Sequence, residues 1–113
     1  MSKREPFLLL EDIIESIRKI RIYTNGLSLA DFLKDDKTID AVIRNFEIIG
    51  EAANRIPDEI RDKFQSVNWH RIRGFRNRIV HDYMGIDYEI VWEIIEKDLE
   101  DLQNKIQAIR DLI

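Results

Sequence analysis

Apolar residues along this chain recur every three to four positions, which is the spacing of amphipathic helices rather than of strands. The four long stripes cover residues 6–23, 38–56, 68–82 and 87–113. Shorter helices are expected at 28–34, where Ser28 suits a helix cap, and at 58–65. Residues 35–37 are expected to form a polar break. The pattern therefore predicts an all-α protein.

The long helices are expected to pack as an antiparallel bundle of four to five helices, in one domain over residues 1–113. The last helix carries more apolar residues than one buried face needs, namely Ile90, Val91, Trp92, Ile94 and Ile95. This surplus favours a second buried surface, most simply in a homodimer. The alternative is that the short helices cover it.

Composition excludes several classes of protein. Cys is absent, so disulfides and thiolate zinc sites are impossible, and a reducing cytoplasm is the expected location. No apolar run approaches the roughly 20 residues that span a bilayer. The apolar run near the N-terminus is interrupted at once by Glu11 and Asp12, so a signal peptide is not expected.

Positive charge gathers in one stretch of an acidic chain. The net charge is −4, yet residues 69–81 hold four arginines and no acid, which leaves −8 for the rest. The arginines are Arg71, Arg73, Arg76 and Arg78, and the stretch ends at His81. Guanidinium groups bind phosphate and an imidazole moves protons near neutral pH, so this pattern indicates chemistry on a phosphodiester. A focused basic patch on an acidic body can hold one stretch of phosphate.

The spacing of Arg76 and His81 raises a geometric problem. Five residues on a regular helix correspond to about 140° of rotation, so the two do not share a face. Asn77 and Arg78, four and three residues before the imidazole, are its natural neighbours. Two arrangements remain open: the helix loosens near Val80, or two copies pair so that both contribute to one cleft.

RNA cleavage without a metal would need few groups. A neutral His81 can remove the proton of a 2′-OH, whose oxygen then attacks the neighbouring phosphorus. Arg76 can pair with the phosphoryl oxygens as their charge builds. A second His81 from a partner chain can protonate the leaving oxygen. DNA, which lacks the 2′-OH, would stay intact, and no metal or other cofactor is expected.

Each of these residues also has a structural interpretation. A lone histidine at a helix end is often a cap, and an arginine run is often a solvated face. Tyr83 can be a residue at the edge of the core. Asp35, Asp36 and Asp40 lie where acids are favoured at a helix start, and His70 has no second imidazole near it in sequence, so neither indicates a metal site.

The motif resembles that of a known superfamily. Arg76-Asn77, three further residues and His81 match the R-polar-x3-H signature of HEPN proteins. With Tyr83 the match becomes R-x4-H-x-Y, the form found in HepT-like toxins of prokaryotic toxin–antitoxin pairs. Further similarity lies in residues 45–52 and 85–87 and at Trp69, Ile72, Arg73, Gly74 and Asp82.

The resemblance implies a dimeric helical bundle with both motifs in a shared cleft. It implies a metal-independent ribonuclease, the toxin of a type VII-like pair, with Arg76 and His81 as catalytic residues. It also implies a partner, an MNT-type nucleotidyltransferase antitoxin that silences the toxin by transferring AMP to Tyr83. Residues expected to bind RNA or support the site are Arg73, Asn77, Arg78 and Glu51.

Two other functions remain open. One is a non-catalytic helical module that binds a nucleotidyltransferase or its nucleotide substrate. Such a module would be expected to lack the arginine or the histidine, and both are present here. The other is a plain dimeric scaffold, in which replacing either residue would change stability but no activity.

Overall fold

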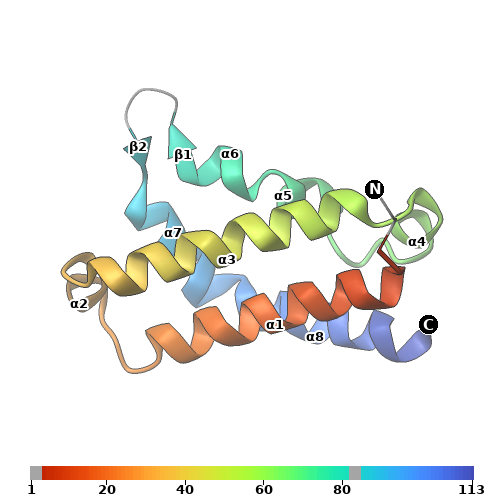
Figure 1. The fold of residues 1–113 in the computed structure, drawn as a ribbon, viewed down its shortest axis with the longest axis horizontal. Coiled ribbons are helices and arrows are strands. Elements are labelled where there is room, and N and C mark those ends of the chain that lie inside the picture. The colour runs from red at the N-terminus through yellow and green to blue at the C-terminus, as the bar shows by residue number, and fades with distance from the viewer. Residues whose placement is uncertain (1–3, 82–84) are drawn as a thin grey trace.

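The computed structural model describes residues 4–81 and 85–113, with Arg76, Val80 and His81 described at the backbone only. Two long helices lie side by side, and the later helices pack around them (Figure 1). In chain order the elements are α1 (Pro6–Thr24), α2 (Leu29–Leu33), α3 (Asp36–Arg55), α4 (Asp58–Lys63), α5 (Trp69–Arg73), α6 (Phe75–Ile79), β1 (Val80–His81), β2 (Gly85–Ile86), α7 (Tyr88–Lys97) and α8 (Leu99–Leu112). The predicted all-α bundle is confirmed.

Local side-chain bonds explain where the second and third helices begin. Ser28 and Asp31 form a reciprocal capping box, as expected for a Ser cap. The backbone N–H of Ser28 donates to Oδ2 of Asp31, and its hydroxyl oxygen accepts from the backbone N–H of Asp31, both at 3.1 Å. Hydrogen bonding to the backbone and side chain of Ser28 lowers the pKa of the Asp31 carboxyl group. Asp35 accepts from the backbone N–H of Thr38 and so caps α3. The expected polar break at 35–37 is therefore wrong for its last two residues, which are already helical.

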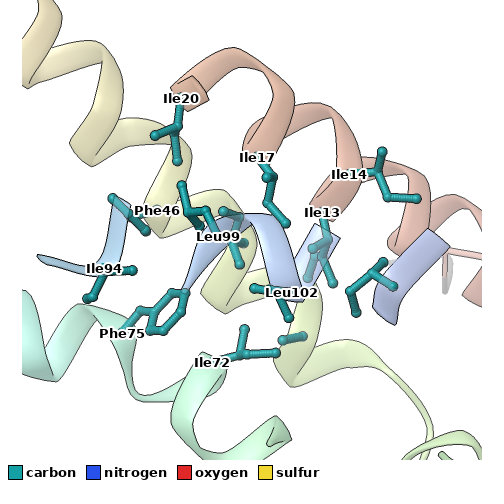
Figure 2. Packing of buried hydrophobic residues seen from close by; sticks show 14 of the residues in the cluster. Ile13, Ile14, Ile17, Ile20, Phe46, Ile72, Phe75, Ile94, Leu99 and Leu102 are labelled. Carbon is teal, nitrogen blue, oxygen red and sulfur yellow. The ribbon is translucent and has the colours of Figure 1, made fainter. Parts of the chain in front are cut away.

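The core forms where α1, α3 and α8 meet the α5–α6 segment. α1 packs along α3, α8 packs against α1, and α5 and α6 lie across α3. Apolar side chains from these helices and from α7 converge in one buried cluster (Figure 2). Its labelled members in Figure 2 are Ile13, Ile14, Ile17, Ile20, Phe46, Ile72, Phe75, Ile94, Leu99 and Leu102. The residues predicted to form the apolar stripes thus supply the core.

The third predicted helix is wrong in its second half. It is divided at Gly74, and the helix ends at Ile79 instead of continuing to residue 82. Val80 then pairs with Ile86 in a two-residue antiparallel ladder. The apolar spacing runs through this point without a break, so periodicity could not predict it. Asp82 and Met84 lie outside the described residues.

The fourth predicted helix is also divided, at Asp98 between α7 and α8. The Asp98 carboxylate accepts a hydrogen bond from Nη2 of Arg71 in α5 at 2.8 Å. This contact joins residues far apart in the chain, so the spacing of apolar residues within one helix could not predict it.

The surplus apolar surface of the last helix is covered within the chain. Val91, Trp92 and Ile94 are buried, and Ile90 and Ile95 pack partly against the core. Phe32 of α2 is fully buried against Trp92, with ring centroids 5.2 Å apart. The short-helix interpretation therefore holds for Trp92, and the homodimer stays a prediction.

None of the helices in the described part of the chain is long and apolar enough to cross a membrane. The cytoplasmic location and the single-domain boundary stay predictions.

At Gly50 the backbone of α3 lies close to that of α5, and the effect of a substitution on stability is predicted to depend sharply on the size of the new side chain. A Cβ at this position would lie 3.6 Å from the carbonyl oxygen of Ile72 and 3.9 Å from that of Arg73, which are ordinary contacts. Gly50→Ala should therefore raise the free energy of unfolding by up to about 1 kcal/mol through helix propensity. Gly50→Leu should lower it by about 1–3 kcal/mol because the larger side chain has no room.

Urea unfolding of the two variants beside the wild type measures the effect. Equal stability of Gly50→Leu and the wild type would contradict the close packing of α3 on α5.

Candidate functional site

The arginine-bearing segment is anchored by its apolar face. Trp69, Ile72, Phe75 and Ile79 are all buried, as the spacing predicted. The indole Nε1 of Trp69 donates to the carbonyl oxygen of Phe64 at 3.1 Å, which satisfies its buried polar atom. Among the described side chains between these four buried residues, His70, Arg71, Arg73 and Asn77 are exposed and Arg78 is half-buried.

Figure 2 shows Phe75 and Ile72 directed into the interior from the α5–α6 segment. The Phe75 ring meets Phe46 of α3 edge to face, with centroids 5.6 Å apart. Asn68 accepts a hydrogen bond from the backbone N–H of Arg71 at 3.0 Å and caps α5 as predicted.

The backbone leaves the helix between Arg76 and His81. Arg76 lies in α6, and His81 lies in β1, opposite Gly85. The ladder is closed by the Asp87 N–H, which donates to the carbonyl oxygen of Ile79 at 2.8 Å. This confirms the loosening near Val80, one of the two arrangements that the sequence left open. The 140° separation of a straight helix therefore does not apply to this pair.

The ladder leads directly into the cap of α7. The Asp87 carboxylate accepts from the backbone N–H groups of Glu89 and Ile90, both at 3.1 Å. Asp87 thus links the β1–β2 ladder to the first turn of α7.

The arginines beside this motif have different surroundings. Arg71 is in an ion pair with Asp98, so one of the four positive charges is compensated. Nε of Arg73 donates to the amide oxygen of Asn54 at 3.1 Å. Arg78 lies over the Phe75 ring, with Cζ 5.9 Å from its centroid. Within the described residues its Nη1 is buried and has no hydrogen-bond partner.

This arrangement corrects the predicted charge of the patch. The segment lacks acids in sequence, but Asp98 neutralises Arg71 from 27 residues away. Arg73 is hydrogen-bonded to a neutral acceptor and keeps its charge. Sequence reasoning missed both Asp98 and Asn54, because neither lies within the motif, and no local pattern indicates their contacts.

The remaining site candidates fall into separate groups. Asn77 is exposed on α6, next to Arg78. Glu51 lies on another side of α3, where its Oε1 accepts from Nη2 of Arg55 at 2.8 Å. It lines a groove of about 140 Å³ with Leu9 and Asp12 of α1. The supporting role of Glu51 therefore stays a prediction, at a place facing α1 rather than α5.

Tyr83 lies outside the described residues, as does Asp82 beside it. In the ranges that the structure covers, no three His, Cys, Asp or Glu side chains gather in a group that could hold a metal ion.

A pocket of about 160 Å³ with both polar and apolar lining lies between α5 and α8, on the side of α5 that carries Arg71. Arg71, Asp98 and Lys105 are among its lining residues, and the last of these pairs with Asp101 at 3.0 Å. Its floor is apolar and belongs to the core. With its basic groups paired in this way, the pocket offers less free positive charge to a phosphate than the Arg73 side does.

Comparison with known proteins identifies relatives along almost the whole chain. The family model described as "Ribonuclease HepT-like" matches residues 13–109. A Methanocaldococcus jannaschii protein named "Putative RNase MJ0127" is 37% identical over 113 residues, which cover 100% of this chain and 91% of that protein. "Probable ribonuclease HepT" of Thermococcus cleftensis is 37% identical over 101 residues, covering 89% of this chain and 92% of that protein. No solved structure matches.

Proposed function

The chain belongs to the ribonuclease HepT-like family, and from that premise we propose that it is a metal-independent endoribonuclease, the toxin of a toxin–antitoxin pair. The observation that carries this proposal is the R-x4-H-x-Y motif, which begins at Arg76 in α6, in a chain that the family model covers from residue 13 to 109. Relatives named as ribonucleases agree with this activity.

The proposed reaction uses two side chains of the motif. Neutral His81 accepts the proton of the ribose 2′-OH, the O2′–P bond forms, and the P–O5′ bond breaks. Arg76 pairs with the non-bridging oxygens, where negative charge builds in the transition state. A protonated His81 of a partner protomer gives its proton to the leaving O5′. The end of α6 at Ile79 supports this pairing, since the backbone turns between the two residues.

Three neighbouring side chains are proposed to hold the RNA backbone. Arg73 and Arg78 have no acidic partner among the described residues, so their charges are available to phosphate. Asn77, exposed beside them, can donate its amide N–H groups to phosphate or sugar oxygens.

We also propose that the site is completed by a second copy of the chain. The apolar residues of α7 do not by themselves indicate a dimer, because Phe32 of α2 covers Trp92 within the chain. Support now comes from the chemistry, which needs a base and an acid, and from the resemblance to HEPN dimers. The other histidine of the chain, His70, lies on α5 outside the motif, so a second motif imidazole would have to come from another chain.

An MNT-type nucleotidyltransferase is proposed as the antitoxin. The Tyr83 hydroxyl would attack the α-phosphorus of ATP, with pyrophosphate leaving and AMP remaining on the tyrosine. The added phosphate would bring negative charge and bulk to a place two residues from His81. RNA phosphate would then be repelled from the site.

Removal of the base should abolish cleavage. Purified wild-type protein in EDTA should cut single-stranded RNA and leave the DNA of the same sequence intact. His81→Ala should slow cleavage by about 10²–10⁴-fold, the usual contribution of a general base. His70→Ala is the matched control, because His70 is exposed on α5 and lies outside the motif. Undiminished cleavage by the His81→Ala protein would exclude this mechanism.

The modification site can be tested against the other tyrosines of the chain. Co-expression with a neighbouring nucleotidyltransferase should add the mass of AMP to the intact protein, and Tyr83→Phe should prevent this. Tyr23→Phe and Tyr88→Phe serve as controls, since both tyrosines are exposed, at 41% and 37%. AMP on either of them, or none at all, would require a different antitoxin mechanism.

A shared cleft requires a dimer in solution. Light scattering should give a mass of about twice the 13.5 kDa of one chain at micromolar concentration. If a preparation that cleaves RNA has the mass of a single chain, the proposal that a partner's His81 acts as the acid is wrong.

A further inference from the structure

The face of α3 that meets α5 continues beyond the core to the surface. A residue no larger than alanine fits at position 50, because a Cβ there would be in van der Waals contact with the carbonyl oxygens of Ile72 and Arg73. Asn54 follows four residues later, so it lies on the same face of α3, one turn nearer the C-terminal end. The packing at Gly50 therefore brings Asn54 beside the last residue of α5.

The contact made there uses a particular nitrogen of Arg73. Nε donates to Oδ1 of Asn54 at 3.1 Å, and both side chains are exposed. A guanidinium held through Nε still has the N–H groups of both terminal nitrogens, which are enough for two parallel bonds to a phosphate. Asn54 is neutral, so this contact orients the guanidinium and does not cancel its charge.

Arg71 provides the contrast within the same helix. Its Nη2 is bound by the Asp98 carboxylate at 2.8 Å, so its charge is compensated and one terminal nitrogen is occupied. The two arginines lie on different sides of α5, one toward α3 and one toward the α7–α8 junction.

Arg73 is also close to the motif along the chain. The N–H of Gly74 donates to the carbonyl oxygen of His70 at the end of α5, and the N–H of Arg78 donates to the carbonyl oxygen of Gly74 at the start of α6, both at 3.0 Å. Arg73 is therefore the last residue of α5, one residue before the helix in which the motif begins.

We propose that Asn54 is a positioning residue that holds Arg73 as a binding group for an RNA phosphate beside the motif. The inference rests on the proposed ribonuclease function and extends it to a residue outside the motif. An amide suits this position on charge grounds. A carboxylate would neutralise the arginine, and a lysine would repel it.

The test measures RNA binding over a series of salt concentrations, in the His81→Ala background so that the RNA stays intact. The probe is a short, fluorescently labelled single-stranded RNA of mixed sequence. Arg73→Ala should weaken binding about tenfold and reduce the slope of log K against log salt by about 0.7, the value for one phosphate contact. Asn54→Ala should weaken binding about three- to fivefold, and Asn54→Asp about as much as Arg73→Ala.

Two comparisons separate positioning from a general effect of charge or folding. Asn54→Ala should have no further effect once Arg73→Ala is present, as expected for residues that act through one another. Arg71→Ala removes the same unit charge from the same helix and should weaken binding less than Arg73→Ala. Urea unfolding should show Asn54→Ala within about 0.5 kcal/mol of its parent, as is usual for a surface substitution.

Specific results would overturn the inference. If Asn54→Ala binds RNA with wild-type affinity while Arg73→Ala binds more weakly, Asn54 does not position Arg73. If Arg73→Ala also binds with wild-type affinity, Arg73 does not contact a phosphate. Either result leaves the ribonuclease proposal standing if the parent protein binds RNA and the wild type cleaves it. Failure of RNA binding and of cleavage would instead reject the proposed function itself.

Discussion

The packing of α5 and α6 on α3 is the constraint on which the arrangement of the site depends. The edge-to-face contact of Phe75 with Phe46 contributes about 0.5–1.5 kcal/mol beyond the burial of the two rings. Gly50 lets the two backbones approach, and the buried Trp69 fixes the start of the segment. With one face held in this way, the polar residues of the segment are carried on the outside, and their surroundings are set by the neighbouring helices.

These neighbouring helices give the arginines of the segment different surroundings, although the segment is uniformly basic in the sequence. The α7–α8 junction supplies a carboxylate to Arg71, whereas α3 supplies a neutral amide to Arg73. Arg78 lies over an aromatic ring, which can attract its charge but does not neutralise it. The positive potential is therefore concentrated toward α3 and the motif. A localised field of this kind suits a protein that must bind one stretch of RNA while its acidic body disfavours the rest.

Much of the fold could be predicted from periodicity, because burial of an apolar stripe is a property of each helix by itself. The first four helices were found close to their predicted ranges, and the buried face of the third stripe was correct at Trp69, Ile72, Phe75 and Ile79. The end of that stripe was wrong. The ladder of Val80 with Ile86 replaces the last helical turn, and the apolar spacing is compatible with either structure.

The sequence by itself determined the helical class, the core residues and the motif from Arg76 to Tyr83 that identifies the family. Only the tertiary structure decided that Asp98 neutralises Arg71, that Asn54 meets Arg73, and that Phe32 of α2 packs on Trp92 of α7. The physical reason is that periodicity reports which face of an element is buried. The partner that each exposed or half-buried side chain meets depends on how distant segments pack, and a local pattern carries no record of it.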